Sequence, residues 1–164
     1  MNILWSYFWP VFAAGLLAGA VAASIAFRRN RRATIIAGGV AASLAAAAIW
    51  HGPVGAADRL ESAVDRDARD VLDFYEMKEV QGILHQDPLS RRLVLTGPAD
   101  DFQCRELVRI MGHLPAVREA SWSGGGGLPL IAEAAIASLV GFLVGAILAY
   151  LIELRRRYNA QWKW

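Results

Sequence analysis

The side chains that could support catalysis or hold a metal ion are few and scattered along the chain. The three histidines, His51, His85 and His113, lie in different predicted elements and do not have the spacing of zinc ligands. The single cysteine, Cys104, excludes an intrachain disulfide and a metal site built from several cysteines. No nucleophilic side chain has a possible general base at a sequence position that would indicate a catalytic pair. We therefore predict that the protein is not an enzyme and has neither a metal nor another cofactor.

Two features could indicate a metal or cofactor site. The acids Asp65, Asp67, Asp70 and Asp73 are dense, but helical spacing scatters them around a helix and arginines interrupt them. We expect a solvated face there and no metal site. His51 ends an apolar run, a place where a haem or pigment could be ligated. The simpler interpretation, which we favour, is a solvated histidine at a membrane interface.

Glu133 and Glu153 lie near the two ends of the last apolar run. An ionisable side chain inside a membrane is a functional candidate by default. Both fall where a carboxylate reaches water or an arginine, so we expect a structural role for each. No predicted span carries a charge at its midplane, which argues against a transporter or channel component.

The charge distribution separates the chain into a polar centre and apolar ends. Hydrophobic residues make up 55% of the sequence and charged residues 20%, unlike an ordinary soluble domain. Residues 52–127 hold nine Lys/Arg and thirteen Asp/Glu, a net of −4, and the rest holds eight and two, a net of +6. The basic residues thus cluster at the ends of apolar runs and form no patch for nucleic acid.

Three apolar runs predict an α-helical membrane protein with three transmembrane helices. The spans are expected at about 4–27 and 33–50, which form a hairpin within 1–51, and at 128–153, where residues 134–152 carry no charge. Between them, residues 52–123 form a helix and a small α/β domain of β-β-α-β order outside the membrane. A glycine linker covers 124–127, and a basic, aromatic tail covers 154–164.

Basic residues orient these spans. Cytoplasmic ends of transmembrane helices carry an excess of Lys and Arg, and tryptophans gather at both interfaces. The topology signals are Arg28, Arg29, Arg31, Arg32, Arg155, Arg156 and Arg157, and the interface anchors are Trp5, Trp9, Trp50, Trp162 and Trp164. We therefore predict a multi-pass protein of a bacterial inner (plasma) membrane, with the N-terminus and central domain in the periplasm and the C-terminus in the cytoplasm.

Two GxxxG motifs mark faces where helices approach closely. Gly15 and Gly19 lie in the first span, and Gly141 and Gly145 lie in the last. Small residues at this spacing allow two helix backbones to come together in a membrane. The sequence leaves open whether the partner helix is internal or belongs to another chain. Membrane lipids and other integral membrane subunits are the expected partners.

The polar segment opens with a charged helix, expected over 57–78. Its apolar residues recur at spacings of three and four, and they are Leu60, Val64, Val71, Phe74 and Tyr75. One interpretation is an amphipathic helix packed on its own domain. The other is a stalk that pairs with another chain.

A compact β-β-α-β pattern follows. Strands are expected at 80–85, 92–96 and 117–122. The intervening helix begins at Asp100, with Gln103 completing a capping box. Its expected apolar face consists of Phe102, Leu107, Ile110, Met111 and Leu114.

Residues 93–97 (LVLTG), the capped helix and residues 114–120 (LPAVREA) together resemble a BON domain. The resemblance covers about residues 80–122, and Ala116 stands where that family usually has glycine before its last strand. It implies a periplasmic module that binds lipid or protein partners and performs no catalysis. The three-span arrangement as a whole resembles no family that we can name.

These observations favour a non-enzymatic accessory or structural subunit of a larger inner-membrane complex that packs through its GxxxG helix faces. A respiratory or photosynthetic electron-transfer complex is the expected host. The alternative is an envelope binding module that holds lipid or a periplasmic partner through the BON-like domain.

Overall fold

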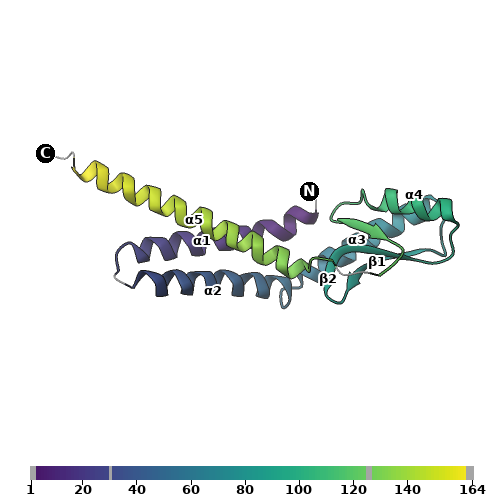
Figure 1. The fold of residues 1–164 in the computed structure, drawn as a ribbon, viewed down its shortest axis with the longest axis horizontal. Helices are drawn as coiled ribbons and strands as arrows, with labels where there is room; N and C mark the ends of the chain where they lie inside the picture. Colours follow the sequence, from purple (N-terminus) through teal and green to yellow (C-terminus); the bar gives the residue numbers. More distant parts are fainter. Residues whose placement is uncertain (1–2, 30, 125–126, 162–164) are drawn as a thin grey trace. The chain divides into compact units, whose positions relative to one another are not determined.

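The protein, seen in a computed structural model, is described over residues 3–29, 31–124 and 127–161 (Figure 1). Within these residues it is mostly helical, with five α-helices and one three-stranded sheet. The chain divides into two compact units. The first comprises Met1–Tyr7 and Gly55–Glu133, and the second comprises Phe8–Val54 and Ala134–Trp164.

Three helices in the described residues are long and apolar enough to cross a membrane. They are α1 (Ile3–Ala26), α2 (Arg32–His51) and α5 (Leu130–Gln161). Their ranges follow the three apolar runs of the sequence. The expectation of a helical protein with three candidate spans is therefore confirmed.

Helix α5 is longer than the expected last span. It continues past Glu153 and through the arginines at 155–157 to Gln161, where a separate tail was expected. The sequence here has no glycine or proline, and its arginines favour helix. Arg157 Nε also donates to Glu153 Oε1 at 3.4 Å, a pairing one helical turn apart. The expected anchors Trp162 and Trp164 lie outside the described residues, as do Gly125 and Gly126 of the expected linker.

The polar unit contains α3 (Ala56–Phe74), β1 (Gln81–Gln86), β2 (Leu89–Thr96), α4 (Asp101–Met111) and β3 (Glu119–Ser121). The sheet order is β1-β2-β3, with β1 antiparallel and β3 parallel to β2. The expected β-β-α-β order is confirmed. Helix α4 joins the two parallel strands, as such a pairing requires a crossover connection.

One face of this sheet and both helices form the core of the polar unit. Strand β2 alternates, so that Leu93 and Leu95 are fully buried while Val94 is only half-buried. Helix α3 packs against β1, and α4 packs against β3. The side chains buried from the helices and from β1 are Ala56, Ala57, Leu60, Val64, Ala68, Leu72, Leu84, Leu107 and Met111.

The buried stripe of α3 differs from the expected one. It continues from Val64 through Ala68 and Leu72, and Phe74 is 79% exposed. Residues four apart in a helix differ by about 40° around its axis, so this stripe winds slowly around α3 and leaves the expected line. Because the stripe is covered by its own sheet, the interpretation as a helix packed on its own domain is confirmed.

Helix α4 begins as expected but buries fewer residues. The Asp100 carboxylate accepts the Gln103 backbone N–H at 2.7 Å, and the Gln103 side chain accepts the Asp100 N–H at 3.0 Å. This capping box is confirmed. Phe102, however, is 66% exposed, so the expectation that it lines the buried face was wrong. It lies in the first turn, five residues before the buried Leu107 and thus about 140° around the helix axis from it.

Candidate functional site

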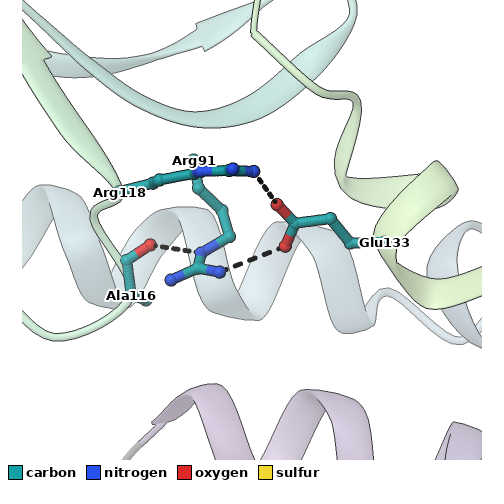
Figure 2. A network of polar contacts seen from close by, with 4 residues as sticks. All are labelled: Arg91, Ala116, Arg118 and Glu133. Carbon is teal, nitrogen blue, oxygen red and sulfur yellow. Dashed lines mark hydrogen bonds and ion pairs between the residues drawn. The ribbon is translucent and has the colours of Figure 1, made fainter. Parts of the chain in front are cut away.

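A cluster of two arginines and one glutamate lies where α5 begins, within the polar unit (Figure 2). Arg91 Nη1 donates to Glu133 Oε2 at 3.1 Å, and Arg118 Nη1 donates to Glu133 Oε1 at 3.4 Å. Each guanidinium is directed at one carboxylate oxygen. The Glu133 side chain is only 13% exposed, so the pairing with Arg91, which is 20% exposed, is poorly screened by water.

The backbone holds this cluster in place. Arg91 lies on β2, and its carbonyl accepts the Arg118 N–H at 2.7 Å just before the parallel β2–β3 pairing begins. Arg91 Nε also donates to the Ala116 carbonyl at 2.8 Å. Glu133 lies in the first turn of α5, where a negative charge complements the helix dipole. The expectation of an arginine within reach of Glu133 is confirmed, and the structural role of Glu133 stays a prediction.

Two backbone positions around this region require unusual geometry. Ala116 has φ +72°, in the left-handed region that glycine adopts without penalty. This is the position at which the BON-like pattern has glycine. Gly97, at the end of β2, has φ +133°, and a Cβ there would lie 2.5 Å from the Glu79 carbonyl oxygen. The backbone at Gly97 thus requires glycine, and the backbone at Ala116 has a conformation that glycine would adopt with less strain.

The Glu133 cluster is satisfied by its own charges and offers no free acid or base. We expect Glu133→Gln to destabilise the protein by about 1–3 kcal/mol, because Arg91 loses a charge-assisted partner in a poorly solvated position. Arg118→Gln should cost less, since the Arg118 side chain is 64% exposed. Thermal unfolding of the full chain in mild detergent measures both effects. Glu153→Gln is the matched control. If it lowers the melting temperature as much as Glu133→Gln does, the Glu133 cluster has no special role in stability.

The glycines of α1 lie against the backbone of α5 in the apolar unit. A Cβ added to Gly15 would overlap the carbonyl oxygen of Ser138, and one added to Gly19 would overlap the carbonyl oxygen of Phe142. No side chain larger than hydrogen fits at either position without moving a helix. The two helices therefore approach each other at backbone distance along this row.

The glycines of α5, in turn, lie against the backbone of α1. A Cβ on Gly141 would overlap the carbonyl oxygen of Phe12, and one on Gly145 would overlap that of Leu16. The GxxxG rows of α1 and α5 thus face each other within this chain. Their glycines are covered internally, so a partner chain would have to use another surface.

Helix α2 joins the same bundle through small and polar side chains. A Cβ on Gly39 would lie 2.6 Å from the Ala22 Cβ and 3.0 Å from a ring carbon of Phe142. Ser43 and Ser138 are buried, and their hydroxyl oxygens lie 2.5 Å apart. Ser138 Oγ also donates to the Ser43 carbonyl at 3.0 Å. Hydrogen bonds of this kind tie helices together in an apolar environment.

We expect Gly145→Ala to lower the melting temperature of the full chain in detergent, because the added methyl separates α1 from α5. Overpacking of this kind costs about 1–3 kcal/mol. Gly38→Ala is the control, since a Cβ at Gly38 meets nothing within 4 Å. The melting temperature of Gly38→Ala should equal that of the wild-type chain or exceed it slightly, because alanine favours a helix more than glycine does. Equal melting temperatures for the two variants would show that the close approach does not stabilise the bundle.

The two basic segments lie at the same end of the apolar unit. Arg157 lies over the Phe27 ring at 5.5 Å from its centroid, and the Phe27 and Tyr150 rings lie 5.3 Å apart. Arg28, Arg29, Arg31 and Arg32 follow Phe27 directly, and all of them are exposed, as are Arg155, Arg156 and Arg157. Both sets of topology signals therefore mark one end of the bundle.

The described tryptophan anchors lie near the ends of their helices. Trp5 and Trp9 lie in the first turns of α1 and are 56% and 54% exposed. Trp50 is the last residue but one of α2 and is half-buried. All three fall at the ends opposite Arg28 and Arg32 along their own helices. These are the positions that interfacial aromatic residues take in membrane helices.

A feature that sequence reasoning missed is an exposed aromatic groove in the polar unit. The groove has a volume of about 400 Å³ and lies between the end of α3 and α4. Its lining residues are Tyr75, Met77, Phe102, Gln103, Glu106, Leu107, Arg109 and Ile110. Phe74 packs edge-on against Tyr75, with ring centroids 5.2 Å apart. The sequence carries no local sign of this exposure, because Phe74 and Phe102 both continue apolar helical patterns.

No metal-ligand cluster of three or more His, Cys, Asp or Glu side chains occurs in the described part of the chain. The acids Asp65, Asp67, Asp70 and Asp73 of α3 belong to no such cluster among the described residues. Asp65 is partly buried. Burial, followed by the nearby charge of Glu61, raises the pKa of the Asp65 carboxyl, which accepts a hydrogen bond from the Leu84 backbone.

Comparison of the chain with protein-family models, with curated proteins and with solved structures found no significant match.

Proposed function

We propose that this chain is a multi-pass protein of a bacterial inner membrane and a non-enzymatic subunit of a larger membrane assembly. The three apolar helices support the membrane placement. The common location of the two arginine segments supports a single orientation, since Arg157 and Phe27 are in contact at one end of the bundle. By the positive-inside rule this end faces the cytoplasm. The polar unit, which follows the opposite end of α2, is then periplasmic.

Single-cysteine labelling tests this orientation in the full chain. In a Cys104→Ser background, Asp101→Cys places an exposed thiol on α4, and Asn159→Cys places one near the end of α5. A maleimide that cannot cross the inner membrane should label Asp101→Cys in cells with a permeabilised outer membrane. It should label Asn159→Cys only after the inner membrane is opened. The reverse pattern would overturn the orientation, and recovery of the chain without detergent would overturn the membrane placement.

The observation that carries the subunit function is the aromatic groove between α3 and α4. Phe74 and Phe102 are 79% and 66% exposed, and Phe102 lines the groove of about 400 Å³. Exposed apolar patches with a polar rim mark interaction sites. The rim here includes the Glu106–Arg109 ion pair, with an N···O distance of 2.8 Å.

A protein segment is the occupant that fits this groove. Aromatic side chains and a charged pair line the same groove, and protein interfaces are enriched in aromatic residues and arginine. The GxxxG glycines Gly15, Gly19, Gly141 and Gly145 are covered within the chain, so a partner would have to use another surface. This groove is an exposed apolar feature of the polar unit that a partner can use. We propose that an apolar helix or loop of a neighbouring subunit docks here. The host assembly we favour is an electron-transfer complex.

Gentle purification from the native membrane tests the docking site. The wild-type chain should recover a defined integral membrane protein in about equimolar amount. Phe102→Ser should reduce that recovery at least about tenfold, as expected for an aromatic anchor. Ile83→Ser is the control, because Ile83 is also exposed, at 42%, but lies on β1 outside the groove.

Three results would each overturn this function: recovery of the chain alone, equal loss with Ile83→Ser, and binding of anionic liposomes through Phe102 without any protein partner. The last result would instead support a periplasmic lipid-binding module. An absorption spectrum of the purified assembly checks the host. Haem or chlorophyll bands would support an electron-transfer complex, and a colourless assembly would overturn that choice of host.

A further inference from the structure

The apolar unit contains a second groove, at the end of the bundle that carries the arginines. It has a volume of about 290 Å³ and is formed by all three apolar helices. Its lining residues are Ala23, Ala26, Phe27, Arg32, Ile36, Leu143, Ala146, Ile147 and Tyr150. Arg32 is the one charged residue among them. The volume is at the lower end of the range for small-ligand sites.

The groove has a buried floor and open apolar walls. Ala23 and Ala26 are 9% and 4% exposed, so small side chains form the floor. Ile36, Leu143 and Ile147 are 43%, 60% and 57% exposed and form the walls. From Leu143 to Tyr150 the wall rises about 10 Å along α5, roughly a third of a bilayer's hydrocarbon core. A narrow apolar channel of this length fits one segment of a hydrocarbon chain.

One end of the groove is positive. Arg32 is the first residue of α2, and within the described residues no side chain caps the first turn of that helix. The uncapped N–H groups and the helix dipole add partial positive charge beside the guanidinium. Arg28 and Arg29 follow the floor residues and raise the local positive potential further. The nearest described acid on α5, Glu153, is already paired with Arg157.

We propose that this groove binds an anionic phospholipid, with one acyl chain in the channel and the phosphate at Arg32 and the first turn of α2. The apolar walls select a hydrocarbon chain, and the positive end selects a negatively charged head group. Basic pockets between membrane helices recognise lipid head groups by this combination. The inference rests on the proposed membrane placement but not on the aromatic groove or on any protein partner.

Native mass spectrometry of the detergent-purified full chain tests the site. Phosphatidylglycerol should remain bound, and phosphatidylcholine with the same acyl chains should not. Arg32→Gln should lower phosphatidylglycerol retention about tenfold or more, since it removes a direct charge-assisted contact. Arg29→Gln removes the same charge from the same loop without touching the groove. It should lower retention by no more than about fivefold, the effect of one nearby surface charge.

A second variant separates the groove from the charge. Ile36→Phe narrows the channel and keeps every arginine, and it should abolish phosphatidylglycerol retention. Glycerol 3-phosphate, which has the charge without the chain, should not compete. The proposal is overturned by equal retention of the two lipids, by equal losses for Arg32→Gln and Arg29→Gln, by retention in Ile36→Phe, or by competition from glycerol 3-phosphate. Each of these results leaves the labelling pattern of Asp101→Cys unchanged, so failure of this site is distinct from failure of the membrane placement.

Discussion

The close approach of α1 and α5 is the constraint on which the apolar unit depends. Four glycines on two helices leave no Cβ between the backbones, and each faces a carbonyl oxygen of the other helix. Without a hydrophobic driving force between helices in lipid, association relies on such close packing and on interhelical hydrogen bonds. The Ser43–Ser138 contact supplies the latter for α2. The glycine rows therefore act as internal structure, and interactions with other molecules fall to the remaining surfaces.

Those surfaces differ in chemistry between the two units. In the polar unit, the exposed groove is lined by aromatic side chains such as Phe102 and edged by a paired Glu106 and Arg109. In the apolar unit, the groove is lined by apolar side chains, with Phe27 and Tyr150 beside aliphatic residues, and Arg32 is its one charged lining residue. We propose a protein segment as the occupant of the first groove and an anionic lipid as the occupant of the second. The partly buried charges of Glu133 and Arg91, by contrast, pair with each other, and we expect that pair to stabilise the fold.

Much of the secondary structure could be predicted from local patterns. The apolar runs predict α1, α2 and α5 because length and hydropathy alone identify such helices. The capping box at Asp100 and Gln103 predicts the start of α4 for a similar reason, since both partners lie within three residues. The end of α5 was missed because a change from apolar to basic side chains alters the environment of a helix without breaking it.

The order of residues is enough to predict most of the helices and strands, and it shows directly where the arginines concentrate and which positions lack a side chain. These properties depend on residue type and short-range spacing. Only the tertiary structure decided that the glycines of α1 face those of α5, that Glu133 meets arginines from β2 and from the approach to β3, and that Phe74 and Phe102 remain outside the core. Each of these depends on which helix face meets which neighbour. Packing between segments far apart in the chain decides which faces meet. The periodicity of apolar residues within one segment cannot predict this pairing.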